Sequence, residues 1–160
     1  MKSKEVFERY GPYMQRCIEL ARKSEGARPF IGSLVISESG KITEGYRKHD
    51  VGINYLIHAE REALDKTNGD ARNGTLVTTL EPCVQLSGNQ LFRSCSDIII
   101  KLGIKRVVLG FVKEQYRVRF LQKNGVEVLV CEGFEEVIKR DLMPLPSEKR
   151  KPLPRRESRY

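Results

Sequence analysis

The second half of the chain alternates apolar runs with helix-forming segments, and this order restricts the possible folds more than any other feature. Residues 74–80, 106–111 and 126–130 are rich in β-branched and apolar side chains, which predicts three strands, the middle one of a buried type. Residues 95–103 and 114–123 lie between them and have helical patterns. Because a strand–helix–strand order implies parallel pairing through right-handed crossovers, we predict a parallel sheet in this half.

The first half of the chain adds a helix and an antiparallel pair of strands. Residues 12–23 place four apolar side chains on one face at helical spacing, with Pro12 in the first turn, where proline is tolerated. Residues 30–36 and 41–46 resemble strands, and the turn-forming residues 37–40 separate them. An antiparallel hairpin is therefore expected beside the parallel strands.

The remaining segments complete one domain over residues 1–142. Residues 47–57 are polar and predict a connection, residues 58–68 are rich in helix formers, and residues 133–142 are expected to form the last helix. A chain of 160 residues fits one domain with one core. The fold class predicted is α/β, a three-layer α/β/α arrangement with a five-stranded mixed sheet.

Composition indicates where the protein is located, and the positions of the cysteines indicate their roles. No run of 18 apolar residues occurs and charged residues are spread through the first ten positions, so we expect neither a membrane span nor a secretory segment, and a cytoplasmic protein. Cys17 lies on the apolar face of a predicted helix and Cys131 directly follows an apolar run, so both are predicted to be core residues. Cys83 and Cys95 flank a polar, glycine-bearing loop, where packing gives no reason for a thiol.

The last segment, residues 143–160, carries half of the excess charge. It holds six Lys and Arg against two Glu, which is +4 of the formal net charge of +8, and four of the seven prolines. This composition is typical of an extended or disordered segment. It fits an electrostatic arm for nucleic acid, and it fits a solubilising end somewhat better.

Three residues have the chemistry of a catalytic metal site. His58, Cys83 and Cys95 can supply one imidazole and two thiolates, which hold zinc with a fourth position open to water. Glu60 stands two residues after the histidine and is a candidate to move protons for that water. The eleven residues between the cysteines exceed the usual spacing of zinc ligands, so structural roles for all four residues stay open.

These residues resemble the zinc-dependent cytidine deaminase superfamily. The motif His58-Ala59-Glu60, followed by Thr-Thr-Leu-Glu-Pro-Cys at 78–83, is similar to the superfamily pattern. The stretched loop before Cys95 and matches over about residues 13–140 are closest to the riboflavin-biosynthesis deaminase domain, which acts on a phosphoribosylated diaminopyrimidinone. The resemblance implies Zn²⁺ on His58, Cys83 and Cys95, Glu60 as the acid and base, a cytidine-deaminase-like fold and a homo-oligomer.

The segments that set specificity depart from that branch. Arg28 stands where the family has an asparagine that contacts substrate, and the cysteine loop and residues 112–115 lack the family's sequences. A related deaminase with altered specificity is therefore expected. Basic residues near the expected pocket mouth suit a phosphate, although an ordinary basic surface has the same composition. The candidate substrate-binding residues are Arg28, Lys48, His49, Asn54, Pro82 and Asn89.

Three functions remain open at this point. The first is a deaminase of an amino-substituted pyrimidine or purine nucleotide or nucleoside. The second is a nucleic-acid deaminase, similar to the tRNA adenosine enzymes, that uses the basic segment 143–160. The third is a zinc-stabilised binding module without turnover, which gives no reason for a carboxylate at the Glu60 position.

Overall fold

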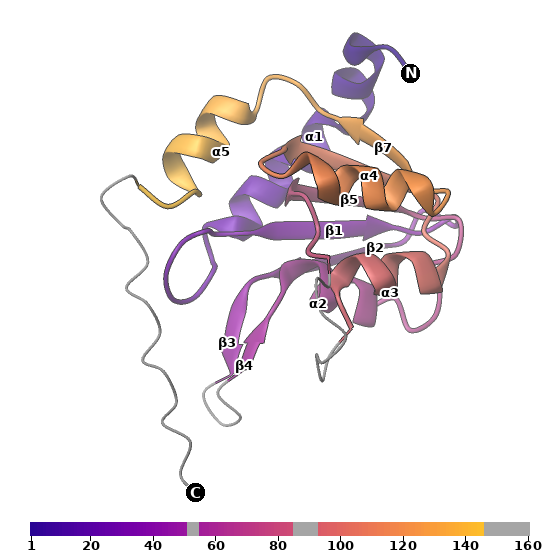
Figure 1. Cartoon of the computed structure of the whole chain (residues 1–160), viewed down its shortest axis with the longest axis horizontal. Coiled ribbons are helices and arrows are strands. Elements are labelled where there is room, and N and C mark those ends of the chain that lie inside the picture. The colour runs from indigo at the N-terminus through magenta and orange to yellow at the C-terminus, as the bar shows by residue number, and fades with distance from the viewer. Residues whose placement is uncertain (51–54, 85–92, 146–160) are drawn as a thin grey trace, which may run out of the picture.

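The centre of the protein is a five-stranded mixed sheet with the strand order β2-β1-β5-β6-β7 (Figure 1). The computed structural model describes residues 1–50, 55–84 and 93–145. β1 pairs antiparallel with both β2 and β5, whereas β5, β6 and β7 run parallel, as predicted. The strands are β1 (Gly32–Ile36), β2 (Ile42–Tyr46), β5 (Thr75–Leu80), β6 (Arg106–Phe111) and β7 (Glu127–Val130).

Helices cover both faces of this sheet (Figure 1). α1 (Ser3–Ala21) and α5 (Glu135–Asp141) pack on one face, and α2 (Ala59–Asp65), α3 (Cys95–Leu102) and α4 (Gln115–Lys123) pack on the other. The predicted three-layer α/β/α fold is thereby confirmed. Among the described residues, no helix is both long enough and apolar enough to cross a membrane.

The central strands are apolar on both sides because each face is covered by helices. Successive residues of one strand therefore enter different cores: Leu76 packs with the α2–α4 layer, and Val77 packs with α1. Cys17 and Cys131 are fully buried in the α1 layer, which confirms that they are core residues.

The first helix begins nine residues earlier than the sequence pattern predicted. α1 starts at Ser3 and contains Pro12 in its interior. Val6 and Tyr10 extend the buried stripe of the helix toward the N-terminus, and both are 2% exposed. Packing of this longer stripe on the sheet outweighs the hydrogen bond that the proline removes, so Pro12 does not mark the helix start.

The segment 47–57, predicted to be a polar connection, contains a small second sheet. β3 (Lys48–Asp50) and β4 (Tyr55–Ile57) form an antiparallel pair. Each strand has only three residues, too few for an alternating pattern to stand out. The pair leads directly into α2, the helix that follows His58.

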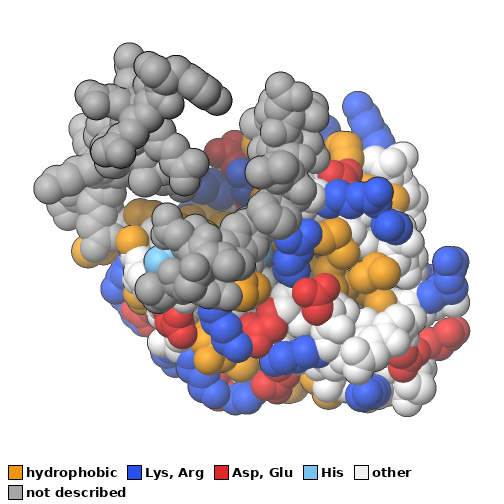
Figure 2. Space-filling view, turned by 90° about the horizontal axis from the view of Figure 1, so that it is seen from below, with side chains coloured by type: hydrophobic (Ala, Val, Ile, Leu, Met, Phe, Trp, Pro, Cys, Tyr) orange, Lys and Arg blue, Asp and Glu red, His pale blue; other side chains and the backbone are white. Residues whose placement is uncertain are grey.

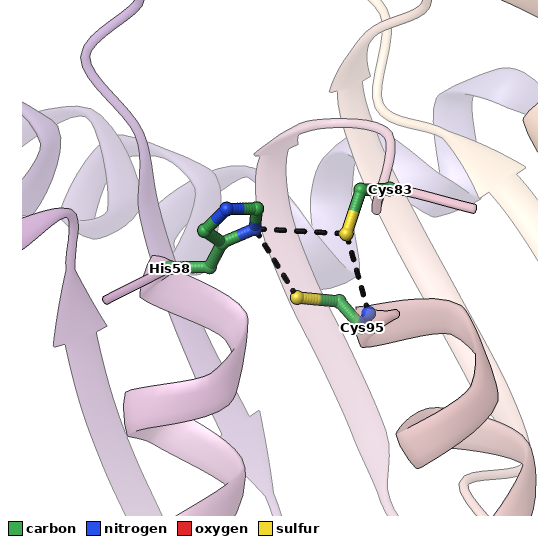
Figure 3. Close-up of side chains that lie close together, drawn as sticks. All are labelled: His58, Cys83 and Cys95. Carbon is green, nitrogen blue, oxygen red and sulfur yellow. Dashed lines mark hydrogen bonds between the residues drawn. The ribbon is translucent and has the colours of Figure 1, made fainter. Parts of the chain in front are cut away.

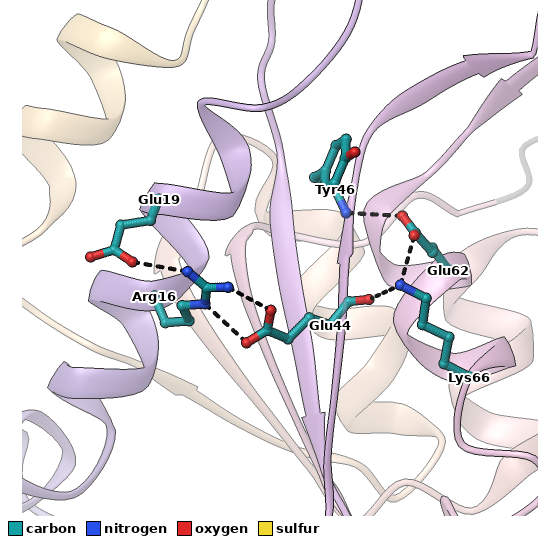
Figure 4. A network of polar contacts seen from close by, with 6 residues as sticks. All are labelled: Arg16, Glu19, Glu44, Tyr46, Glu62 and Lys66. Carbon is teal, nitrogen blue, oxygen red and sulfur yellow. Dashed lines mark hydrogen bonds and ion pairs between the residues drawn. The ribbon is translucent and has the colours of Figure 1, made fainter.

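Polar contacts hold α2 against β2. Figure 4 shows Glu62 of α2 accepting the backbone N–H of Tyr46 at 3.1 Å and pairing with Lys66 at 2.8 Å. Lys66 also donates to the backbone oxygen of Glu44, whose carboxylate binds Arg16 of α1. Burial raises the pKa of Glu62, but its hydrogen bonds from Lys48, Lys66 and Tyr46 outweigh this effect and lower the pKa overall. The network therefore connects α1, β2 and α2.

We predict that Gly45→Ala destabilises the fold by displacing α2. A Cβ at Gly45 would collide with the backbone oxygen of Ala59 and lie 2.8 Å from the backbone nitrogen of Ala63. Backbone atoms of a packed helix cannot move aside locally, so we expect the free energy of unfolding to fall by about 1–3 kcal/mol or more. Urea denaturation monitored by circular dichroism measures the change.

Gly11→Ala in α1 is the matched control. A Cβ at Gly11 meets only the Phe7 ring, at 3.9 Å, and alanine favours a helix over glycine by up to about 1 kcal/mol. This variant should be as stable as the parent protein or slightly more stable. Equal stability of Gly45→Ala and the parent would contradict close packing of α2 on β2.

Candidate active site

Three separate elements bring His58, Cys83 and Cys95 together (Figure 3). His58 is the N-cap residue of α2, Cys83 follows the end of β5, and Cys95 is the first residue of α3. The Nδ1 atom of His58 lies 3.6 Å from the Sγ atom of Cys83 and 3.4 Å from that of Cys95. All three candidate ligand atoms lie within 4.8 Å of one another.

Local hydrogen bonds explain how two cysteines so far apart in sequence meet. Ser94 caps α3 by accepting the backbone N–H of Asp97 at 3.1 Å. The first turn of α3 is hydrogen-bonded to the residue that follows β5, because the backbone N–H of Ser96 donates to the Cys83 oxygen at 3.1 Å. The backbone N–H of Cys95 also donates to the Cys83 sulfur, at 3.3 Å. The start of α3 therefore lies beside Cys83 despite the intervening loop.

The donor atoms fit a zinc ion. Tetrahedral zinc with bonds of about 2.0 Å to nitrogen and 2.3 Å to sulfur separates such ligands by roughly 3.6 Å, close to the two distances observed here. A hydrogen bond from the Cys95 thiol and a hydrogen bond with His58 lower the pKa of Cys83. The Cys83 thiolate in turn raises the pKa of Cys95, so a cation is needed to bring both sulfurs into the thiolate form.

Glu60 lies beside these ligands on the first turn of α2. Its side chain is buried, at 2% exposure, and its Oε2 atom has no hydrogen-bond partner among the described residues. Burial raises the pKa of Glu60 to about 7. A carboxylate with a free oxygen and such a pKa can accept and return a proton near neutral pH.

Glu60, His58 and Cys83 face a cavity of about 410 Å³. This volume suits a small organic molecule. Charged and metal-binding side chains form one part of the described wall, and apolar side chains form the other. The polar part comprises Arg47, His58, Glu60, Glu81, Cys83, Lys113, Glu114 and Arg117, and the apolar part Pro29, Ile31, Leu56, Leu80, Met143 and Pro144.

Glu81 connects the metal-binding segment to the loop after β6. Its side chain is fully buried and accepts the backbone N–H groups of Lys113 at 3.0 Å and Glu114 at 3.1 Å. The Nη1 atom of Arg117 lies 3.8 Å from the same carboxylate. Glu81 therefore holds Lys113 and Arg117 at the wall of the cavity next to Cys83.

Arg28, predicted to bind substrate, points elsewhere. Its Nη1 atom donates to the backbone oxygens of Arg140 at 3.3 Å and Met143 at 3.4 Å. Among the described residues, the cavity wall includes its neighbour Pro29 but not Arg28 itself. Arg47 does line the cavity, yet its guanidinium donates to the backbone oxygens of Pro29 and Ala27.

Three other predicted substrate residues, Lys48, His49 and Pro82, are also placed outside the described cavity wall. Lys48 pairs with Glu62 at 2.6 Å and lines a second, shallower pocket. The backbone N–H of His49 donates to Glu25, and the oxygen of Pro82 accepts the Ser96 hydroxyl at 3.4 Å. Asn54 and Asn89 lie outside the residues that the structure describes.

Several wall residues were not singled out from the sequence. Glu81 stands within the quoted motif at 78–83, and Lys113, Glu114 and Arg117 follow the carboxyl end of β6. Ligands of open α/β sheets bind at the carboxyl ends of parallel strands, so this position was an available signal. Nothing in the sequence indicated that Met143 lines the cavity, because it is the first residue of the basic, proline-rich segment 143–160.

Comparison with known proteins agrees with this geometry. A family model described as "Cytidine and deoxycytidylate deaminase zinc-binding region" matches residues 8–111, which include all three candidate ligands and Glu60. The riboflavin biosynthesis protein RibD of Aquifex aeolicus is 34% identical over 131 residues, covering 77% of this chain and 33% of RibD. The chain thus spans about a third of the length of this relative.

Solved structures show the same fold. The diaminohydroxyphosphoribosylaminopyrimidine deaminase/5-amino-6-(5-phosphoribosylamino)uracil reductase of Thermotoga maritima matches with a TM-score of 0.66 and 34% identity, over 82% of this chain and 38% of that one. The dCMP deaminase of cyanophage S-TIM5 matches with a TM-score of 0.62 and 25% identity, over 77% of this chain and 97% of that one. The chain therefore belongs to the family of deaminases defined by the cytidine and deoxycytidylate deaminase zinc-binding region.

Proposed function

We propose that this protein is a zinc-dependent hydrolytic deaminase of an amino-substituted pyrimidine or purine nucleotide or nucleoside. The observation that carries the proposal is the buried, unpartnered Oε2 atom of Glu60 in the same cavity as His58 and Cys83. A binding module without turnover gives no reason to bury a carboxylate beside three metal-ligand side chains, because such burial costs free energy.

His58, Cys83 and Cys95 would hold the zinc, which when bound supplies the Lewis acidity that makes water an effective nucleophile near neutral pH. Glu60 accepts a proton as water adds to the ring carbon that bears the amino group. It then transfers that proton to the ring nitrogen, and afterwards takes the proton of the added hydroxyl and transfers it to the departing amine as the carbonyl forms. The overall reaction consumes one water, replaces the amino group by a carbonyl and releases ammonia.

Aminopyrimidines are the first substrates to consider. The names of the relatives specify a diaminopyrimidine carrying a phosphoribosyl group and dCMP, and both compounds are phosphorylated aminopyrimidines. In this chain Lys113 and Arg117 line the cavity and offer positive charge to such a phosphate. Both lie in or next to a segment, 112–115, that departs from the riboflavin branch, which supports an altered specificity.

Ammonia release from a substrate panel tests the proposal. The zinc-loaded protein is incubated with cytosine, cytidine, dCMP, the phosphoribosylated diaminopyrimidinone, adenosine, guanine and oligonucleotides. We expect turnover on at least one free aminopyrimidine, and loss of that turnover on removal of zinc with a chelator. Absence of ammonia release from every compound would refute the proposal.

The alternative of a nucleic-acid deaminase depends on the basic segment at the C-terminus. Figure 2 shows Lys and Arg side chains interspersed with Asp and Glu on the visible face, rather than gathered into one basic surface of the described residues. Phosphate contacts of DNA-binding proteins normally come from such a gathered surface. On this face, the distribution gives no support to a nucleic-acid substrate.

We predict that removing residues 146–160 leaves turnover of a small substrate unchanged within about twofold. The cut follows Leu145, because Met143 and Pro144 line the cavity and must stay. A full-length variant with the six Lys and Arg of the segment changed to Gln is the matched control for charge alone. If the substrate is a polynucleotide, both variants should instead bind it more weakly and with a smaller salt dependence, and that result would refute the preferred class.

A further inference from the structure

The chain immediately after α5 forms part of the cavity wall. Met143 and Pro144 line the cavity together with Pro29, Ile31 and Leu80. Met143 is 9% exposed and packs in the same apolar cluster as Leu80 at the end of β5. Since Glu81 and Cys83 follow Leu80 in the chain, Met143 belongs to the immediate surroundings of the candidate active site.

Arg28 fastens this wall to the segment before β1. Its guanidinium donates to the backbone oxygens of Arg140 and Met143, and lies 5.4 Å from the centre of the Phe30 ring. The backbone N–H of Phe30 donates to the oxygen of Leu142 at 2.8 Å. These contacts satisfy backbone oxygens in and just after the last turn of α5, where the helix offers no partner, and hold Met143 in the cavity wall.

We propose that Met143 determines substrate specificity by forming the apolar wall of the substrate pocket, and that Arg28 is a positioning residue that acts through Met143. The proposal rests on the proposed function, since it places a planar amino-substituted ring in this cavity. Such a ring needs polar partners at its edge and apolar contact elsewhere. A methionine thioether is polarisable and packs well against aromatic rings.

The shape of the arginine side chain is essential to this role. Both hydrogen bonds come from the one nitrogen Nη1, and the planar guanidinium can lie over the Phe30 ring at the same time. A lysine ammonium keeps the charge and can donate to these oxygens but has no planar face for the ring, and a glutamine loses the charge as well. Arg28→Lys should therefore retain part of the positioning of Met143 that Arg28→Gln loses.

Methionine NMR tests the positioning role without any need for activity. The chain has three methionines, of which Met14 is fully buried and Met1 is 49% exposed. In protein labelled with ¹³C in the methionine methyl groups, we expect Arg28→Gln to move the Met143 signal toward the position of an exposed methionine. The Met14 signal should stay in place and report an intact core. An unchanged Met143 signal would overturn the positioning role.

Arg22→Gln is the matched control. Arg22 also reaches the end of α5, but its partner is the Asp141 carboxylate at 3.5 Å, and the arginine side chain is 51% exposed. This variant removes one positive charge near α5 without touching the bonds to Arg140 and Met143. The Met143 signal should not change.

Steady-state kinetics test the effect on substrate. On the aminopyrimidine with the highest turnover, we expect Arg28→Gln and Met143→Ala each to raise KM roughly tenfold, with kcat and zinc content changed less than about threefold. The double variant should raise KM no more than either single change, since residues that act through one contact are not additive. Multiplying effects would overturn the link between the two residues.

The two measurements separate this inference from the proposed function. If the parent protein releases ammonia from no compound of the panel, the proposed function fails, and the specificity role of Met143 fails with it. The NMR result for Arg28→Gln still decides whether Arg28 holds the wall. If the parent protein is active but Met143→Ala leaves KM unchanged on every substrate, the specificity role alone is refuted.

Discussion

Replacing Glu60 with glutamine should lower the turnover of amine release by roughly a hundredfold or more while the protein stays folded and keeps its zinc. Glutamine has nearly the same shape, so the buried site beside α2 can accept it, but the amide cannot take a proton from water. Loss of a positioned acid and base typically costs two to four decades in rate, about 10²–10⁴. Ammonia release under saturating substrate measures the change, with elemental analysis for zinc.

Asp65→Asn is the control for removing one negative charge from the same helix. Asp65 is the last residue of α2 and is exposed, so its substitution should leave kcat within about twofold. If Glu60→Gln keeps full turnover, the carboxylate is not the proton carrier. If it loses zinc together with activity, Glu60 supports the metal site rather than the chemistry, and that outcome also refutes the assigned role.

The parallel half of the fold can be predicted from sequence because short strands and helices alternate along it. β5 and β6 are mostly buried and β7 lies at the edge of the sheet, but all three are rich in β-branched residues, and right-handed crossovers between them give parallel pairing. The first helix was predicted too short because Pro12 is a strong local signal for a helix start. Whether such a signal is overridden depends on packing against the sheet, which local sequence does not contain.

The candidate metal site can also be predicted, because its residues follow strand and helix ends in a motif with a chemical meaning. His58 and Cys95 stand at the starts of two helices, and Cys83 follows a strand. The eleven-residue gap between the cysteines gave little support for a shared ion. The bond from Ser96 to the Cys83 oxygen, which closes the gap in space, has no sequence signature.

The residues that contact the substrate could not be predicted from the sequence. A basic residue near a pocket mouth can bond either a ligand phosphate or the protein's own backbone oxygens, and its chemistry is the same in both cases. Arg28 and Arg47 bond backbone oxygens, and Lys48 pairs with Glu62. Only the three-dimensional course of the chain shows which oxygens lie within reach, so composition alone overestimates the basic character of the cavity.

Removing one sulfur ligand should weaken zinc binding by at least about a hundredfold and abolish turnover. Zinc sites of this kind are worth roughly 10–16 kcal/mol in all, so the loss of one of three protein ligands costs on the order of 3–5 kcal/mol. Each 1.4 kcal/mol is about a factor of ten in affinity. Cys95→Ala tests this prediction directly, with zinc affinity measured by competition against a chromophoric chelator.

Cys131→Ala is the matched control, because it removes an equally buried sulfur from the opposite layer. Cys95 is 3% exposed and Cys131 fully buried, but only Cys95 lies within reach of His58. The control should unfold somewhat more easily, since it leaves a small cavity in the core, yet it should bind zinc with parental affinity. If both variants kept one zinc per chain at parental affinity, the two sulfurs would be equivalent, and the ion would have to be held by residues other than His58, Cys83 and Cys95.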